Sequence, residues 1–235
     1  MAKKKEDVKF HVPKGIENYF ESAKTYQKET YQKGSFKDII KKDMRKGKTK
    51  FGILIKNIVA SASLNVKIPL EKILKSVEGA EYPSKYPGLV YRMKNPKVAA
   101  SLFSSGKIVL TEATSVADVR KALGKVVKML RSLQIDVPKK YEMNIENILA
   151  TAWFPYMSLI PEKIVSELEG FEYEPGQNPD FNPPLYHKMK DPKADIYLFS
   201  CGKVLIEHIK KIEDIERAMN ILFKKFKSIG AIKKY

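Results

Sequence analysis

Apolar residues recur at helical spacing in two long segments of the chain. From Ser115 to Leu133 they lie three and four positions apart, and Ser115 stands where a serine caps a helix N-terminus. The segment from Ile212 to Phe226 has the same spacing. A stripe of this kind faces a core while the other positions face water. Both segments are therefore predicted to form amphipathic α-helices.

Shorter elements fill the intervening sequence. Two short helices are predicted over residues 69–79 and 161–170, because each range begins with proline and ends with glycine. Apolar runs within residues 102–111 flank a Ser-Gly pair and predict a β-hairpin. Ser200-Cys201-Gly202 marks a second hairpin. Strands and helices therefore occur in the same order twice.

The chain repeats itself from residue 51 onward. Asn57-Ile58 returns 90 positions later as Asn147-Ile148, and Leu102-Phe103-Ser104 returns 96 positions later as Leu198-Phe199-Ser200. The second copy thus carries extra residues, which lie in a Pro/Asn/Gly-rich stretch typical of a loop. We divide the chain into a basic N-terminal extension (1–50), a first repeat (51–141) and a second repeat (142–235).

Each copy is predicted to contain a strand, a short helix, several antiparallel strands and a long helix. This is an α+β arrangement, and we expect a single antiparallel sheet with all helices on one face. Side chains alternate between the two faces of a strand, so the residues of the bare face can be assigned. In the first copy they are Asn57, Val59, Ser101, Phe103, Val109 and Thr111, and in the second Asn147, Leu149, Tyr197, Phe199, Leu205 and Glu207.

This bare face is nearly uncharged, with Glu207 as the exception. An exposed apolar sheet face is typical of a binding surface. The pattern alone leaves two interpretations open. The face either binds a partner that excludes water, or it packs against another domain or a second copy of the chain.

The charge of the chain points to a polyanionic partner. Its 235 residues include 44 Lys+Arg and 27 Asp+Glu, a net charge of +17, which attracts nucleic acid and also anionic membranes. Residues 1–50 hold 15 basic and 7 acidic residues, so this segment is either a solubilising tail or a nonspecific contact to nucleic acid. No uninterrupted apolar run approaches the length of a membrane span, and no secretory signal is recognisable. We expect a soluble intracellular protein without a membrane partner.

Few residues suit metal, cofactor or catalytic chemistry. Cys201 is the only cysteine, and His11, His187 and His208 are the only histidines. The glycine-rich loops GxGxxG and GxxxxGK[ST] are both absent. No pair of carboxylates or activated nucleophile stands out at catalytic spacing. We therefore expect no enzyme activity, no cofactor and no metal.

Several motifs in fixed order carry a family resemblance. They are Asn57-Ile58-Val59-Ala60, Glu81-Tyr82-Pro83, Tyr86-Pro87-Gly88-Leu89-Val90-Tyr91-Arg92-Met93 and Leu102-Phe103-Ser104-Ser105-Gly106-Lys107-Ile108-Val109-Leu110-Thr111. With them and its two copies, the sequence resembles the TATA-binding protein family over residues 52 to about 229. Archaeal members look closer than eukaryotic ones.

The resemblance implies a saddle with pseudo-twofold symmetry, in which a curved antiparallel sheet carries helices on its convex face. It also implies a general transcription initiation factor that binds and bends A/T-rich promoter DNA in the minor groove. Such a factor recruits transcription factor B and RNA polymerase. It lies with the chromosome, in the cytoplasm of an archaeon or in the nucleus of a eukaryote. Free of DNA, it could form a homodimer.

The resemblance also assigns roles to single residues. The amides on base edges are Asn57 and Asn147, and the residues on the groove floor are Val59, Val109, Thr111, Leu149 and Leu205. The wedges between base steps are Tyr86, Phe103, Phe181 and Phe199. Arg92 and Lys188 contact phosphates, and Glu174 contacts transcription factor B. Without the resemblance, Phe103 and Phe199 are better interpreted as core residues. Asn57 and Asn147 have the alternative of satisfying backbone groups at strand edges, although a functional role is favoured, and Arg92 and Lys188 have the alternative of being ordinary surface charges.

The second copy departs from the family pattern in the loop before its hairpin strands. At the 96-residue offset Tyr86 falls on Asn182, so Phe181 supplies the wedge after a one-residue slip, or the wedge is missing. Pro184 stands in the position of Gly88 and stiffens the loop.

A third departure places Glu207 in the position of Thr111. A carboxylate on the groove floor must be paired or it weakens binding, because an unpaired buried charge is costly. The candidate partners in the sequence are Lys203 and His187. The alternative interpretation is a diverged paralogue that acts mainly as a protein-interaction or regulatory module with weak DNA binding.

Overall fold

The fold is that of a computed structural model, which describes residues 49–84, 86–173 and 184–234. Residues 1–48 of the predicted N-terminal extension lie outside the described residues, as do Glu174 and Phe181. The chain divides into two compact units, Met1–Asp43 and Met44–Tyr235. The elements below all belong to the second unit.

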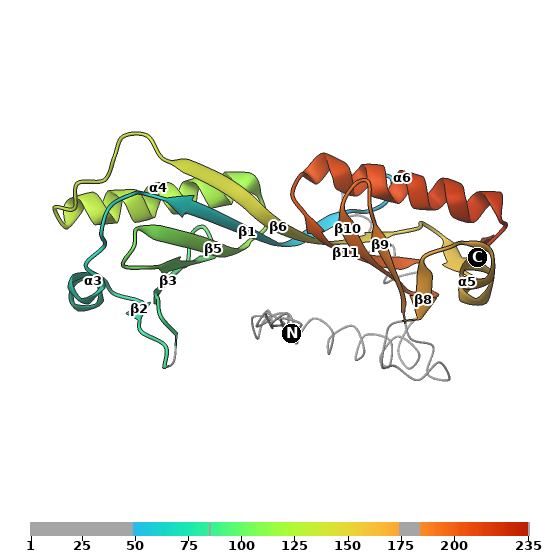
Figure 1. Cartoon of the computed structure of the whole chain (residues 1–235), viewed down its shortest axis with the longest axis horizontal. Helices are drawn as coiled ribbons and strands as arrows, with labels where there is room; N and C mark the ends of the chain where they lie inside the picture. The colour runs from blue at the N-terminus through green and yellow to red at the C-terminus, as the bar shows by residue number, and fades with distance from the viewer. Residues whose placement is uncertain (1–48, 85, 174–183, 235) are drawn as a thin grey trace, which may run out of the picture. The chain divides into compact units, whose positions relative to one another are not determined.

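The second copy repeats the elements of the first in the same order and adds the strands β7 and β12 (Figure 1). The first copy consists of β1 (Leu54–Ser63), α3 (Leu70–Ser76), β2 (Ala80–Glu81), β3 (Leu89–Met93), β4 (Val98–Leu102), β5 (Lys107–Ala113) and α4 (Val116–Ser132). The second consists of β6 (Glu142–Trp153), β7 (Met157–Leu159), α5 (Pro161–Glu167), β8 (Phe171–Tyr173), β9 (Leu185–Met189), β10 (Ala194–Leu198), β11 (Lys203–Ile209), α6 (Ile212–Ser228) and β12 (Ile232–Lys234). The pairing of β7 with β12 was not predicted from the sequence.

One antiparallel sheet of ten strands joins the two copies. Its order is β2-β3-β4-β5-β1-β6-β11-β10-β9-β8. The first strands of the two copies, β1 and β6, pair at its centre, from Leu54 opposite Thr151 to Ser63 opposite Glu142. Outward from this pair the two copies add their strands in the same sequence. The predicted α+β fold, with two tandem repeats on a curved antiparallel sheet, is confirmed.

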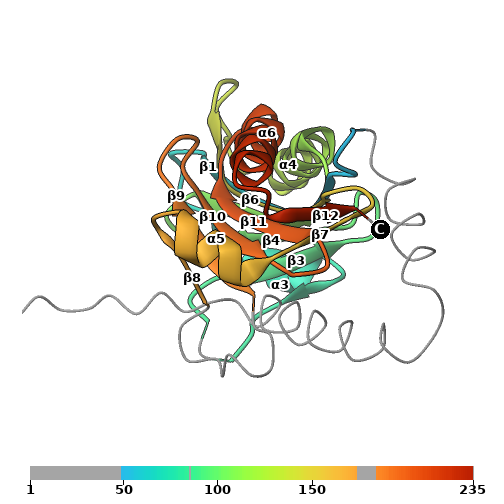
Figure 2. The ribbon, with the colours of Figure 1, turned by 90° about the vertical axis from the view of Figure 1, so that its right-hand side faces the viewer.

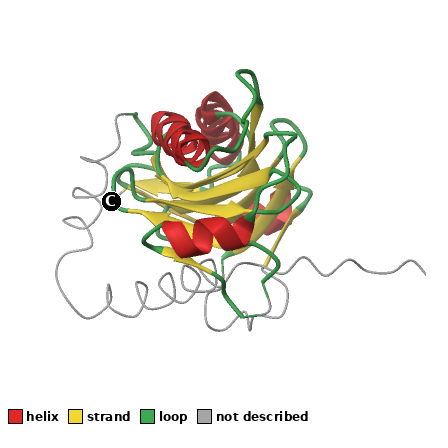
Figure 3. Ribbon diagram, turned by 90° about the vertical axis from the view of Figure 1, so that its left-hand side faces the viewer, coloured by secondary structure: helices red, strands yellow, loops and turns green. Residues whose placement is uncertain are grey.

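The long helices α4 and α6 lie on the same face of the sheet (Figures 2 and 3), α4 over the strands of the first copy and α6 over those of the second (Figure 1). Ser115 caps α4 as predicted, since its hydroxyl accepts a hydrogen bond of 3.1 Å from the Asp118 N–H. The short helix α5 begins at Pro161, and α3 begins directly after Pro69. No helix in the described ranges is both long and apolar enough to span a bilayer.

The main core lies between the sheet and the helices. Ile58, Leu102 and Leu110 are fully buried in it, together with helix residues such as Val119 and Leu222. Every second residue of each central strand enters this core, as the alternation predicted. The remaining side chains of those strands therefore lie on the opposite face.

A β-bulge interrupts this alternation at the same place in both copies. Glu112 in β5 and His208 in β11 have φ of 69° and 59°, which is unusual for residues other than glycine. The register of each strand shifts there, so that the next residues, Ala113 and Ile209, return to the core. The apolar pattern gave no sign of this bulge, because the bulged residues are polar and exposed.

Two glycines allow a direct test of the backbone geometry. Gly106 has φ of +91°, and a Cβ added there would lie 2.3 Å from the Val66 carbonyl oxygen, whereas a Cβ at Gly124 in α4 would meet nothing within 4 Å. We expect Gly106→Ala to lower the free energy of unfolding by more than about 1 kcal/mol. Gly124→Ala should raise it by about 0.5–1 kcal/mol, because alanine favours a helix. Urea unfolding followed by circular dichroism measures both, and equal effects of the two substitutions would contradict the assigned hairpin geometry.

Candidate nucleic-acid interface

We call the sheet face opposite α4 and α6 the underside. The predicted face residues lie on strands at positions that alternate with core residues, apart from Phe103 and Phe199, which directly follow β4 and β10, and none of them belongs to the main core. Six buried apolar residues are likewise outside the main core: Val90, Ala99, Leu149, Trp153, Phe199 and Leu205. The strand alternation places all six on the underside as well.

The first half of the underside is partly open. Val59, Phe103, Val109 and Thr111 are half-buried there, and Phe103 contacts Tyr86 with a distance of 5.9 Å between ring centroids. Tyr86 is 37% exposed. The structure therefore brings the two predicted wedge residues of the first copy together at the surface.

Gly88 makes this aromatic pair possible. A Cβ at this position would lie 3.0 Å from the rings of both Tyr86 and Phe103. Any other residue would therefore push the rings apart. The second copy has Pro184 at the equivalent position.

The second half of the underside is more closed. Leu149, Phe199 and Leu205 are only 3%, 6% and 8% exposed, and the Lys203 ammonium lies over the Phe199 ring, 5.6 Å from its centroid. Larger aromatic side chains stand in this half. They are Trp153, Tyr186 and Tyr197, which replace Ser63, Val90 and Ser101 of the first copy. The partner that we predicted for Phe199, Phe181, lies outside the described residues.

Two asparagines occupy equivalent positions next to the central seam. The Asn57 Oδ1 accepts a hydrogen bond of 2.8 Å from the Glu112 N–H, and the Asn147 Oδ1 accepts one of 2.8 Å from the His208 N–H. The donors are the bulged residues of β5 and β11. Because an N–H can only donate, each amide must turn its oxygen toward the strand and its Nδ2 away from this bond.

The predicted phosphate contacts differ in their surroundings. The Arg92 guanidinium donates to Glu81 over 3.0 Å and to Glu112 over 3.1 Å, and it is largely exposed. To reach a phosphate it must share or exchange these two carboxylates. Lys188 is exposed on β9, directly across the strand pair from Asp195.

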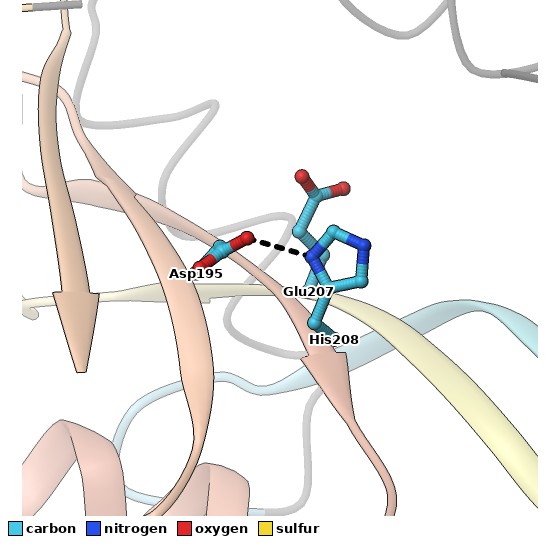
Figure 4. A group of neighbouring side chains, drawn as sticks. All are labelled: Asp195, Glu207 and His208. Atoms are coloured by element: carbon cyan, nitrogen blue, oxygen red, sulfur yellow. Dashed lines mark hydrogen bonds and ion pairs between the residues drawn. The ribbon is translucent and has the colours of Figure 1, made fainter. Parts of the chain in front are cut away.

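In the second half, a polar network stands where the first half has mostly small side chains. Asp195, which stands where the first copy has Ala99, accepts hydrogen bonds from the Tyr186 hydroxyl over 3.2 Å and lies 2.8 Å from the His208 Nδ1. Figure 4 shows Asp195 and His208 joined in this way, with the Glu207 side chain beside them. Sequence reasoning missed Asp195 and His208 as members of the site; the 96-residue offset, which aligns Asp195 with Ala99, was a signal that could have found Asp195.

Glu207 is the most buried charged group of this network, with 8% exposure. Burial raises the pKa of its carboxyl group above the ordinary value, more strongly than His208 and the Tyr197 hydroxyl lower it. Asp195 adds to the rise. In turn, burial and the adjacent Glu207 raise the pKa of Tyr197, so this phenol stays protonated and donates to the carboxylate. Tyr197 and His208, rather than Lys203 or His187, are thus the groups that partly offset the effect of burial on the pKa of Glu207.

Asp195, Glu207 and His208 place one potential metal-ligand atom each within 4.8 Å of one another. Both carboxylates already have protein partners, however, since Asp195 meets Tyr186 and His208 and Glu207 meets Tyr197. This is the arrangement of a hydrogen-bond network rather than of an open set of ligands.

The geometry defines the architectural class of the protein. Two copies of one unit share a sheet, bury one face under helices and present paired amides and aromatic side chains on the other. That is the architecture of a two-repeat α+β protein with helices on only one face of its sheet.

Comparison with known proteins identifies the family. The model of the family described as transcription factor TFIID, or TATA-binding protein, matches residues 52–133 and 142–229. The TATA-box-binding protein of Methanobrevibacter smithii is 39% identical over 179 residues, which is 74% of this chain and 96% of that protein. That of Methanothermobacter thermautotrophicus is 40% identical over 167 residues, 71% of this chain and 90% of the relative.

A solved structure agrees with these relatives. The Methanococcus jannaschii TBP matches with a TM-score of 0.66 and 37% identity, covering 75% of this chain and 98% of the solved chain. The chain therefore belongs to the TATA-binding protein family. The family is one of transcription factors, and the relatives named here are archaeal.

The buried carboxyl group gives a prediction for stability against pH. Because the pKa of Glu207 is raised in the folded protein, the native state binds this proton more tightly than the unfolded chain does. Its contribution to stability is present at low pH and is lost as pH rises through the raised pKa. Glu207→Gln removes this dependence, so the variant should gain free energy of unfolding relative to the parent as pH rises. Urea unfolding at steps from about pH 4 to pH 8 measures the difference, and a difference that is constant with pH would contradict the burial of an ionisable Glu207.

Proposed function

We propose that the chain is a general transcription initiation factor that binds A/T-rich promoter DNA in the minor groove through the underside and bends it. The observation that carries this proposal is the pair of asparagines whose Oδ1 atoms are held by backbone N–H groups. The same proposal assigns the groove floor to Val59, Val109, Thr111, Leu149 and Leu205.

The orientation of the two amides supports minor-groove recognition. The minor-groove edges of A·T and T·A pairs present only acceptors, adenine N3 and thymine O2. A side chain that reads them must offer donors. With Oδ1 engaged by the strand, Asn57 and Asn147 each have an Nδ2 amino group available to donate to those acceptors. The fixed orientation also lowers the entropy lost on binding.

The aromatic pair of the first copy supports bending. Phe103 and Tyr86 lie together at the outer part of the underside, where they are partly exposed. Apolar side chains that enter the minor groove between base steps unstack them and kink the duplex. Phe199 and Phe181 would do the same in the second copy, with Arg92 and Lys188 contacting phosphates.

The proposed role in transcription is based on the names of the relatives. They are named TATA-box-binding proteins, and we propose the same ligand here, with the chain located at the chromosome. We further propose that the protein recruits transcription factor B through the loop that contains Glu174, and RNA polymerase in turn. Without DNA, the apolar underside would favour a homodimer.

The high positive charge supports binding to a polyanion. The net charge is +17, and residues 1–50 contribute +8 of it, from 15 basic and 7 acidic residues. We propose that this basic extension adds nonspecific contacts to phosphates, which strengthen at low salt.

A second candidate function rests on the second half of the underside. Glu207 and Asp195 put two carboxylates on a face that would meet DNA, and the neighbouring Leu149 and Leu205 are nearly inaccessible. These features favour a diverged paralogue that acts mainly as a protein-interaction or regulatory module with weak DNA binding. Direct measurement of affinity separates the two functions.

Substitution of Phe103, one of the predicted wedge residues, makes that measurement possible. We expect Phe103→Ala to weaken binding to an A/T-rich duplex by roughly 2–4 kcal/mol, by analogy with the loss of other buried aromatic contacts. The bend angle, read from fluorescence transfer between the duplex ends, should fall as well. Fluorescence anisotropy of a labelled duplex gives the affinity.

Ile212→Ala is the matched control, because Ile212 is an exposed apolar residue at the start of α6. It should leave affinity and bend unchanged. Equal affinities of the parent and Phe103→Ala would count against the assigned face. Weak binding by the parent itself, without bending, would favour the interaction module.

A further inference from the structure

Four polar residues of the second half replace small or neutral residues of the first half, and a fifth, His208, replaces Glu112. In order along the chain, Val90, Ala99, Ser101, Thr111 and Glu112 correspond to Tyr186, Asp195, Tyr197, Glu207 and His208. The strand pairing agrees with this correspondence, because Ala99 lies opposite Thr111 and Asp195 lies opposite Glu207. The five side chains of the second half contact one another, so they form one connected network rather than separate surface substitutions.

The network holds the Glu207 carboxylate in place. The Tyr197 hydroxyl donates to it, and Tyr197 packs against Tyr186 with 5.4 Å between ring centroids. Tyr186 in turn donates to Asp195, whose other oxygen lies 2.8 Å from the His208 Nδ1. A carboxylate has about four acceptor positions, and one phenol hydroxyl occupies only one of them. With 8% exposure, Glu207 has little water to satisfy the rest.

This arrangement is unsuited to an A·T pair. The minor-groove edges of A·T pairs carry acceptors only, so an ionised carboxylate would face adenine N3 or thymine O2 without a hydrogen bond. The first half has Thr111 at this position, and a hydroxyl can donate. Among the base pairs, only G·C offers a donor in the minor groove, the guanine 2-amino group.

Building on the proposed function, we propose that Glu207 accepts a hydrogen bond from a guanine 2-amino group, so that the second half of the underside selects a G·C pair at the step it faces. The DNA sequence that the protein prefers is therefore asymmetric. The half under Thr111 is A/T-only, and the half under Glu207 contains one guanine. Glu207 is a specificity-determining residue for the bound sequence.

The energetics favour a fixed acceptor at this place. The cost of removing the carboxylate from water is already incurred in the free protein, since burial raises its pKa before any ligand arrives. A donor that reaches the remaining lone pairs then makes a charge-assisted hydrogen bond without a further large desolvation cost. The Tyr197 and Tyr186 contacts keep the side chain in one orientation, which lowers the entropy lost on binding.

The test isolates the 2-amino group. An A/T-rich duplex is prepared with one adenine at a time replaced by 2,6-diaminopurine, which adds this amino group to the minor groove and keeps the pairing with thymine. The parent protein should bind one of these duplexes about tenfold more tightly than the unmodified duplex, the effect of one charge-assisted hydrogen bond. Most other replacements should weaken binding, because the added amino group meets apolar or donor groups.

The variant Glu207→Thr restores the residue of the first copy and should lose the tenfold gain while still binding the unmodified duplex. Glu207→Met, which keeps a similar volume without an acceptor, should behave in the same way and serves if the threonine variant unfolds. Circular dichroism checks the fold of both.

Two results would overturn the inference while leaving the proposed function intact. In the first, the parent binds the unmodified duplex but gains nothing from diaminopurine at any position. In the second, both variants keep the gain. Failure of the parent to bind any of the duplexes would instead contradict the proposed function, and the inference with it.

Discussion

The antiparallel pairing of β1 with β6 is the constraint on which the rest of the structure depends. It joins the two copies into one sheet, with Asn57 opposite Leu149 and Val59 opposite Asn147. Both asparagines are thereby placed next to the seam, related by the approximate twofold axis between the copies. Backbone groups along the seam pair with one another in the ladder, so the recognition groups that we propose here are side chains.

The scaffold is symmetric, but the underside is not. The bulges at Glu112 and His208, the asparagine hydrogen bonds and the helix-covered core recur in both copies. Non-glycine residues at positive φ cost roughly 1–3 kcal/mol each, and in both copies the bulged residue donates its N–H to an asparagine of the underside. The side chains around these fixed points differ, with an open aromatic pair in one half and a closed polar network in the other. A symmetric frame with different surfaces suits an asymmetric ligand.

Much of the fold and of the underside could be predicted from the sequence. Periodicity located the helices, and the repeat offsets predicted the order of the strands and which residues share the underside. The bulges were not predictable, because the polar residues Glu112 and His208 leave no mark in an apolar pattern. The ion pairs of Arg92 and the hydrogen bonds of Asp195 join residues from different strands, so only strand register brings them together. Glu207 was recognised as a departure from the first copy, but its partner Tyr197 lies on the neighbouring strand and needed the structure.

The central claim is that the underside reads DNA from the minor groove. Inosine·cytosine pairs present the minor-groove edge of A·T pairs but a different major-groove edge, so they separate the two modes of reading. The measurement is the affinity of the full chain for an A/T-rich promoter duplex before and after every A·T pair is replaced by inosine·cytosine. The account predicts that the affinity stays within about threefold, and a loss of more than about thirtyfold would contradict it.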